Sequence, residues 1–239
     1  MKAMLLAAGL GTRLKPFTDS HPKALAVLNG KTLLQRNIEY LSGAGVTDFI
    51  INVHHFAKQV IDFLSTNNDF GKSITISDES ESLLETGGGL MKASWFLKDD
   101  PSPFILMNVD VLTDMHMEAM IRQHIKLKPL VTLAVSNRHT SRYFLFEDVG
   151  QLCGWKNIKT GEQKISREVS KFYPKAFSGI HVISPEIFSL IKREGKFSLV
   201  DVYLDLAVAH KIIDFEHSQS KFIDVGKPGS IEKAENIFP

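Results

Sequence analysis

The chain has little cysteine, little net charge and no long apolar run. Cys153 is its only cysteine, so no intramolecular disulfide can form, which favours a reducing compartment. The formal net charge of +1 creates no global field that would draw the chain to nucleic acid or to an anionic membrane. The apolar run near the N-terminus is short and is interrupted by Arg13 and Lys15, so we expect neither a signal peptide nor a membrane span. These absences predict a cytoplasmic protein that binds neither nucleic acid nor a membrane.

The sequence also lacks the features that divide a chain into separate domains. It contains no internal repeat, no low-complexity segment and no long linker rich in proline, glycine and serine. Its 239 residues are enough for a sizeable core, and the hydrophobic fraction of 44% is that of a soluble globular protein. We therefore expect a single domain over residues 1–239.

Apolar runs of strand length alternate with segments of helical periodicity over the first part of the chain. The strand-like runs lie at 49–53, 74–76, 104–107 and 130–135. Helical spacing is found at 34–41, 60–64 and 115–126. This alternation predicts an α/β fold with a mostly parallel, mixed sheet of Rossmann-like form and helices on both faces. Ligands bind such sheets beyond the carboxyl ends of the strands, so Gly9, Asp78 and Asn108–Asp110 are expected to meet at one edge.

The pattern loosens from about Arg138. Residues 143–147 and 152–157 are expected to form a hairpin around the turn at 148–150. The polar segment 159–175 is expected to be an exposed flap, mobile without ligand, in which Lys164, Arg167, Lys171 and Lys175 could meet a phosphate. Further on, 176–183 and 222–225 are strand-like, and Leu199 to Leu206 has helical spacing.

Residues 3–25 carry the strongest chemical signal. Ala3–Ala8 is typical of a buried parallel strand, and it ends at Gly9 and Gly11, where the backbone can approach a ligand closely. Pro16 and Pro22 then prevent an ordinary helix and stiffen a long loop. A strand that opens into glycines and exposed amides is suited to holding phosphates.

Two cationic side chains in this loop can complete a phosphate site. Arg13 can grip a triphosphate bidentately, and Lys23 can place a point charge near the α-phosphate. The dinucleotide fingerprint does not fit, because Leu14 stands where a third small residue is needed, and the Gly-Lys-Ser/Thr of the Walker A motif is absent.

Asp110 and Asp224 are the candidate metal ligands, since each ends a short apolar strand. Two carboxylates together with phosphate oxygens and water molecules suit Mg²⁺. The alternative for both residues is that the side chain caps a following helix.

A third glycine-rich element runs from Leu84 to Gly89. Its adjacent glycines indicate either close contact between backbone and a flat ligand, followed by a helix N-terminus, or a flexible turn. Asp78, Glu79 and Glu81, just upstream, are typical of a solvated loop, although one of them could accept a hydrogen bond from a base.

The segment Leu6–Leu14, with the sequence L-A-A-G-L-G-T-R-L, together with Pro22–Leu25 resembles the signature of the sugar-1-phosphate nucleotidyltransferases. The resemblance covers nearly the whole chain and is closest to the short members that activate N-acetylmuramic acid 1-phosphate with UTP. Four further segments match: Leu84–Gly89, Asn108–Asp114, Phe177–Ile180 and Asp224–Gly226. One departure is Val109, where the family usually has glycine.

The resemblance implies a glycosyltransferase-A-like fold and a role for each matched residue. Arg13 and Lys23 would be catalytic, Asp110 and Asp224 would hold Mg²⁺, and Ser178 and Gly179 would lie beside the sugar. The implied nucleotide-binding residues are Ala8, Gly9, Gly11, Thr12, Arg13, Lys23, Thr86, Gly87 and Asn108. By the same likeness, residues 1–137 would form a nucleotide-binding half and residues 138–239 a sugar-binding half.

The expected activity is the condensation of a nucleoside triphosphate with a sugar 1-phosphate, which releases pyrophosphate. UTP and N-acetylmuramic acid 1-phosphate are favoured. Three alternatives stay open: a guanylyltransferase for mannose or heptose 1-phosphate, a cytidylyltransferase for phosphocholine, and a non-catalytic sensor of nucleotide sugars. A monomer is favoured.

Overall fold

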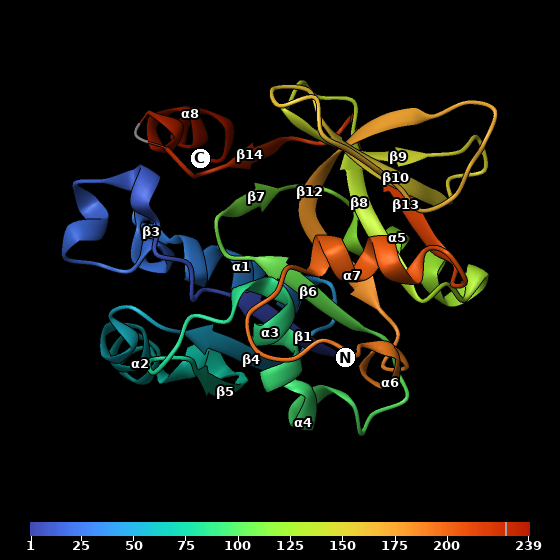
Figure 1. Ribbon diagram of the computed structural model, residues 1–239. Coiled ribbons are helices and arrows are strands. Elements are labelled where there is room, and N and C mark those ends of the chain that lie inside the picture. Colours follow the sequence, from blue (N-terminus) through green and yellow to red (C-terminus); the bar gives the residue numbers. More distant parts are fainter. Residues whose placement is uncertain (228) are drawn as a thin grey trace.

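The computed structural model describes residues 1–227 and 229–239. Its central feature, within those residues, is a ten-stranded mixed sheet (Figure 1). The first part of the sheet is parallel and has the order β6 (Phe104–Asn108), β1 (Lys2–Leu6), β4 (Asp48–Val53), β5 (Ser73–Asp78). The carboxyl ends of these four strands therefore lie along one edge.

The sheet becomes mainly antiparallel in the second part of the chain. β12 (Tyr173–Ile183) pairs antiparallel with β6, and on its other side with β8 (Val131–Ser136) and β9 (Arg142–Phe146). The remaining strands are β13 (Ile212–Glu216), parallel to β8, and β10 (Leu152–Asn157) with β11 (Gln163–Ile165), which continue from β9. The long strand β12 thus joins the two parts into one sheet.

Helices cover both faces of the sheet, because the strands bury apolar side chains on both sides. Ala3 and Leu5 of β1 belong to one core cluster, whereas Met4 belongs to the other. The first cluster is covered by α1 (Leu33–Gly43), α2 (Ala57–Thr66) and α5 (Met117–Leu127). The second is covered by α3 (Glu85–Lys92), α4 (Ser94–Leu97), α6 (Ile187–Leu190) and α7 (Leu199–Leu206). The expected α/β fold, with helices on both faces of a mixed sheet, is confirmed.

A small two-stranded sheet lies next to the main one. β14 (Phe222–Asp224) pairs antiparallel with β7 (Val111–Thr113), and α8 (Ser230–Ile237) follows it. A third apolar cluster joins α8 to the N-terminal loop and to the hairpin of β2 (Val27–Leu28) and β3 (Lys31–Thr32). Figure 1 shows the red C-terminal helix beside this blue hairpin. The last residues of the chain are thereby packed against the first loop.

Three expectations about local structure are wrong in part. Segment 159–175 is not a loop throughout, because it contains β11 and the start of β12. The adjacent glycines after Thr86 form neither a loop nor a turn, since they lie inside α3. Strand β13 and helix α8 were not expected from the apolar pattern. Among the described residues, no helix is both long and apolar enough to cross a membrane.

Candidate active site

A cleft of about 540 Å³ opens past the carboxyl ends of β1, β4 and β6. Its lining includes residues 6–13 and, from other parts of the chain, Lys23, Asn52, Glu79, Thr86, Asn108, Asp110, Ser198 and Gly226. The polar residues that follow separate parallel strands are thus gathered at one place, as expected for an α/β sheet. Asp78 is exposed and is not part of this lining.

The loop after β1 is held in shape by Gly11. Its φ is +61°, and a Cβ there would lie 2.8 Å from Cγ2 of Thr18 and 3.1 Å from Cβ of Lys23. The carbonyl of Gly11 accepts hydrogen bonds from the amide of Leu14 at 2.8 Å and from the Thr18 hydroxyl at 3.0 Å. Gly9 differs, because a Cβ there would meet nothing within 4 Å among the described residues. Gly11 therefore closes the loop on itself, and Gly9 leaves its backbone open to the cleft.

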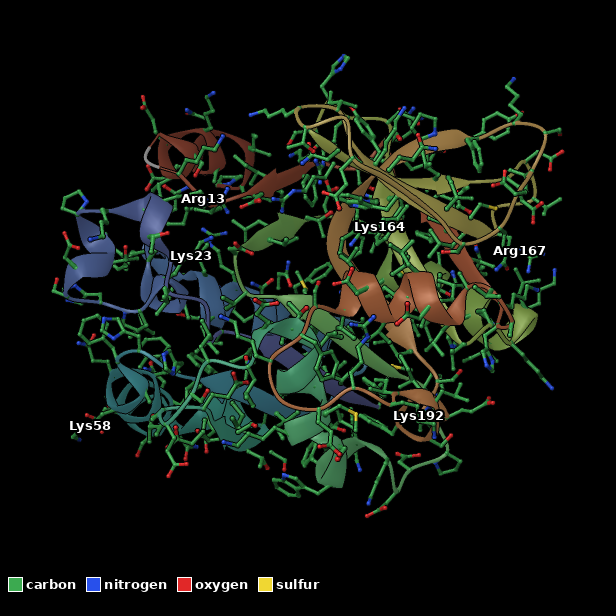
Figure 2. All side chains as sticks on the ribbon, in the orientation of Figure 1. Arg13, Lys23, Lys58, Lys164, Arg167 and Lys192 are labelled. Atoms are coloured by element: carbon green, nitrogen blue, oxygen red, sulfur yellow. The ribbon has the colours of Figure 1, made fainter. Side chains whose placement is uncertain are left out.

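Lys23 and Arg13 bring positive charge to the cleft. Lys23 is only 8% exposed, and its ammonium group forms an ion pair with the carboxylate of Asp110. Arg13 is exposed, and its Nη2 lies beside Gly226, 3.1 Å from where a Cβ would be. Figure 2 labels both side chains, on the side of the molecule near β14 and α8.

The pairing of β14 with β7 brings Asp224 next to Asp110. Asp224 lies opposite Val111, and the amide of Val225 donates a 2.8 Å hydrogen bond to the carbonyl of Asp110. Neither aspartate caps a helix: α5 begins after His116 and α8 after Gly229. The capping alternative is therefore wrong for both residues.

The electrostatics of this pair fit a divalent cation. Partial desolvation raises the pKa of the Asp224 carboxyl, and the negative charge of Asp110 raises it further, whereas Lys23 and Arg13 act in the opposite direction. Within residues 1–227 and 229–239, no group of three or more His, Cys, Asp or Glu side chains could hold a metal ion. A cation at this pair would consequently need phosphate oxygens and water to complete its shell, which is the coordination that Mg²⁺ favours.

Asn108 faces the cleft, and Ser178 and Gly179 lie behind it. A Cβ on Gly179, whose φ is +74°, would come 2.7 Å from Nδ2 of Asn108. Ser178 is buried, and its hydroxyl hydrogen-bonds to Nε2 of His217 at 2.7 Å. Neither residue is part of the cleft lining, so they pack against the site rather than opening into it.

The glycines of α3 are required by packing between distant segments. A Cβ on Gly87 would lie 2.3 Å from the ring of Phe197, and one on Gly88 would lie 2.2 Å from the carbonyl oxygen of Gly195. Gly87 is absent from the cleft lining, whereas Thr86 contributes to it and accepts a 3.0 Å hydrogen bond from the amide of Leu199. The helix α3 is thus joined to the start of α7.

The lining residues that were missed from the sequence or interpreted otherwise include Asn52, Glu79 and Ser198. Asn52 is a polar residue inside the apolar run 49–53, and that interruption is a signal that could have found it. Glu79 was grouped with a solvated acidic patch, yet its exposed fraction is 0%. Ser198 is the N-cap of α7, where its hydroxyl accepts from the amide of Val200 at 3.2 Å.

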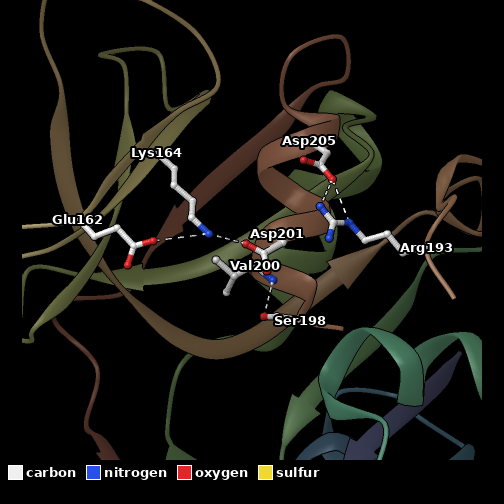
Figure 3. A network of polar contacts seen from close by, with 7 residues as sticks. All are labelled: Glu162, Lys164, Arg193, Ser198, Val200, Asp201 and Asp205. Carbon is white, nitrogen blue, oxygen red and sulfur yellow. Dashed lines mark hydrogen bonds and ion pairs between the residues drawn. The ribbon is translucent and has the colours of Figure 1, made fainter. Parts of the chain in front are cut away.

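The basic residues of segment 159–175 are not part of the cleft lining. Lys164 forms ion pairs with Asp201 at 2.9 Å and with Glu162 at 3.8 Å, as Figure 3 shows. Lys175 pairs with Glu216. Two of the four side chains that could have met a phosphate are therefore bound to carboxylates of the protein.

Curated relatives match the chain over almost its full length. N-acetylmuramate alpha-1-phosphate uridylyltransferase of Caulobacter vibrioides is 29% identical over 242 residues, which cover 98% of this chain and 95% of that protein. The protein of the same name from Neisseria meningitidis is 29% identical over 238 residues, covering 99% and 98%. Mannose-1-phosphate guanyltransferase 2 of Candida glabrata is 30% identical over 237 residues, which cover 95% of this chain and 62% of the longer protein.

Solved structures of similar fold were also found. HddC from Yersinia pseudotuberculosis, complexed with GMP-PN, superposes with a TM-score of 0.78 at 24% identity, covering 100% of this chain and 99% of that chain. The inositol-1-phosphate CTP transferase from T. maritima has a TM-score of 0.78 at 16% identity, covering 99% and 94%. At these identities the likeness shows the fold alone.

The family model for nucleotidyl transferases matches residues 2–149, which contain the loop after β1, Lys23 and Asp110. This match covers more than half of the chain and agrees with the signature at Leu6–Leu14. The chain therefore belongs to the nucleotidyltransferase family, and its resemblance to the sugar-1-phosphate nucleotidyltransferases is confirmed.

Proposed function

We propose that the protein is a Mg²⁺-dependent enzyme that condenses UTP with N-acetylmuramic acid 1-phosphate to give the UDP-sugar and pyrophosphate. The observation that carries this proposal is the gathering of Arg13, Lys23 and Asp110 in the lining of one cleft. Asp224, from the other end of the chain, is not part of that lining but is brought beside Asp110 by the pairing of β14 with β7. The choice of UTP and of this sugar rests on the names of relatives that are 29% identical over nearly the whole chain.

The reaction needs no covalent enzyme intermediate. A phosphate oxygen of the sugar 1-phosphate attacks the α-phosphorus, a new P–O bond forms, and the bond from the α-phosphorus to the bridging oxygen breaks as pyrophosphate leaves with its electron pair. The protein has to hold two anions that repel each other and to stabilise the charge of the transition state.

The residues of the cleft can meet these demands. The open backbone at Gly9–Thr12 and the exposed guanidinium of Arg13 would bind the triphosphate. Lys23, held at the Asp110 carboxylate, would place its positive charge beside the α-phosphate. Asp110 and Asp224 would hold Mg²⁺, which when bound neutralises charge on the phosphate oxygens.

The proposal extends to the two parts of the chain. Residues 1–137 would bind the nucleotide and residues 138–239 the sugar, with β12 as the strand that joins them. Ser178 and Gly179 would lie beside the sugar, and Gly179 packs against Asn108 of the cleft lining. The lone Cys153 and the low net charge support a cytoplasmic location.

A guanylyltransferase is the second candidate function. Mannose-1-phosphate guanyltransferases are as similar to the chain as the uridylyltransferases, at 28–30% identity. In this reading GTP and mannose or heptose 1-phosphate would be the substrates, and the roles of Arg13, Lys23 and the two aspartates would be unchanged.

Pyrophosphate release from a panel of the four nucleoside triphosphates with several sugar 1-phosphates tests the proposal. We expect the highest kcat/KM for UTP with N-acetylmuramic acid 1-phosphate and no turnover after chelation of divalent cations. A preference for GTP would support the guanylyltransferase, the second candidate function, instead of the uridylyltransferase. Binding of nucleotide sugars without turnover of any pair would make the protein a sensor and overturn the enzymatic proposal.

A further inference from the structure

A buried polar network lies under the phosphate-binding loop, formed by Asn52 and Glu79. Asn52 is 2% exposed and Glu79 is 0% exposed, although both border the cleft. Asn52 is the last residue but one of β4 and lies opposite Leu6 of β1. Glu79 follows β5, and its amide donates a 2.7 Å hydrogen bond to the carbonyl of Val53. Polar groups this deeply buried are costly unless their hydrogen bonds are satisfied.

Asn52 holds the backbone at the start of the loop. Its Oδ1 accepts hydrogen bonds from the amide of Ala7 at 2.7 Å and from the amide of Ala8 at 3.3 Å. Both alanines are nearly fully buried, so without Asn52 these amides would lose the side-chain acceptor that satisfies them. The exposed backbone of Gly9 follows directly. The direction in which the chain leaves β1 is therefore set by this one side chain.

Glu79 fixes the orientation of Asn52 and connects it to α3. Oε1 of Glu79 accepts a 2.7 Å hydrogen bond from Nδ2 of Asn52, and Oε2 accepts a 3.2 Å hydrogen bond from the amide of Leu84. A Cβ on Gly89 would lie 2.7 Å from Oε1 of Glu79 and 3.0 Å from Nδ2 of Asn52. The glycine thus lets α3 approach the pair closely. The direction of each hydrogen bond in this network is therefore fixed, because each donor faces an acceptor.

We propose that Asn52 and Glu79 are a positioning pair that sets the loop after β1 and the start of α3 in register for the nucleotide. Neither side chain has to touch the substrate: Asn52 acts through the amides of Ala7 and Ala8, and Glu79 acts through Asn52 and Leu84. The kinetic consequence rests on the proposed nucleotidyltransferase function, whereas the effect on the loop backbone does not.

The test reverses the direction of the hydrogen bond between Asn52 and Glu79. Asn52→Asp keeps an oxygen for the two amides but sets carboxylate against carboxylate. Glu79→Gln leaves one acceptor oxygen for two donors, so its amide nitrogen faces either Nδ2 of Asn52 or the amide of Leu84. In the double variant Asn52→Asp/Glu79→Gln the new glutamine donates to the new aspartate, and its oxygen still accepts from Leu84. Every hydrogen bond of the network is then restored, and only the one between positions 52 and 79 has the opposite direction. Two damaging single changes that repair each other identify a direct interaction.

Two readouts are measured on each variant of the full chain. The first is hydrogen exchange of peptides covering residues 4–12, which requires no turnover: we expect faster exchange in each single variant and wild-type exchange in the double. The second is steady-state kinetics with the preferred triphosphate. Each single change should raise the KM for the triphosphate about 10- to 100-fold while the KM for the sugar phosphate changes less than about twofold. The double variant should return within about fivefold of wild type.

Thr132→Val is the matched control, because it removes a buried hydrogen bond, to His124 at 2.9 Å, that lies away from the cleft. It should lower thermal stability without changing either KM or the exchange of residues 4–12. Unchanged exchange in both single variants, or a double variant no better than the worse single, would overturn the positioning pair. A wild-type protein without turnover would instead overturn the proposed function, and the exchange data would still decide the role of the pair.

Discussion

The protein contains two kinds of ion pair that involve lysine, and they differ in where they lie. Lys23 and Asp110 meet in the cleft, with side chains 9% and 20% exposed. Lys164 and Asp201 meet on the surface between β11 and α7, with side chains 48% and 35% exposed (Figure 3). Exposed pairs of this type contribute about 0–1 kcal/mol, because water solvates each partner almost as well. A largely desolvated pair is costly to break, because removal of one partner leaves the other charge unpaired away from water.

Removal of the Asp110 or Asp224 carboxylate should have the largest effect on activity. If Asp110 and Asp224 share one Mg²⁺, Asp110→Asn and Asp224→Asn should each lower kcat/KM by about 10³-fold, and the double variant should be little worse than either single. Pyrophosphate release at a series of Mg²⁺ concentrations measures both effects. Losses that multiply in the double variant would show that the two aspartates act separately.

Loss of the cleft lysine should come next. We expect Lys23→Ala to lower kcat/KM by about 10²–10³-fold, because it removes a preorganised positive charge at the reacting phosphate. Lys15→Ala is the control in the same loop, since Lys15 is exposed, forms an ion pair with Asp19 at 2.8 Å and is not part of the cleft lining. Circular dichroism of both variants checks the fold. Near-wild-type turnover by a folded Lys23→Ala variant would remove Lys23 from the mechanism.

The buried His124 is a third case to set beside the two lysine ion pairs, because it is uncharged in the folded protein at neutral pH. Burial lowers the pKa of His124 to about 4, below its usual value of 6.5. The unfolded chain therefore binds a proton between these values that the folded protein does not. Stability is fully present above pH 6.5 and falls as the pH drops towards 4, by up to about 3 kcal/mol. Urea unfolding at pH 7 and pH 4.5 should show a smaller loss for His124→Gln than for wild type. An equal loss would assign the acid sensitivity to other groups, such as the buried His181.

The smallest effect is expected at the surface pair. Asp201→Asn removes the partner of Lys164 and should change the free energy of unfolding by no more than about 1 kcal/mol. Turnover should stay within about twofold of wild type, because neither side chain lines the cleft. Thermal unfolding at low and high salt provides the measurement, and the difference from wild type should vanish at high salt. A large loss of activity would mean that the hairpin and α7 take part in catalysis.

Much of the part of the cleft that is formed by the loop after β1 could be predicted from local patterns. The apolar strand before Gly9 and the loop glycines each follow from rules that act over a few residues. The hairpin at 143–157 could also be recognised, because turn residues separate two strand-like runs. Strand β13 and helix α8 were missed, because both are short and bury their apolar residues against parts of the chain that are distant in sequence.

The sequence by itself determined the α/β class and the family to which the chain belongs, and it predicts phosphate binding at the loop Leu6–Leu14. These properties depend on which residue types recur at short spacing. The periodicity of helices and strands then decides which side chains share a face. Only the tertiary structure decided that Asp224 meets Asp110, that Glu79 is buried beneath Asn52, and that Lys164 is held by Asp201. Each of these contacts joins segments through strand pairing or helix packing over long sequence separations. A charged residue looks the same in sequence whether it faces solvent, a ligand or a buried partner, so its environment had to come from the fold.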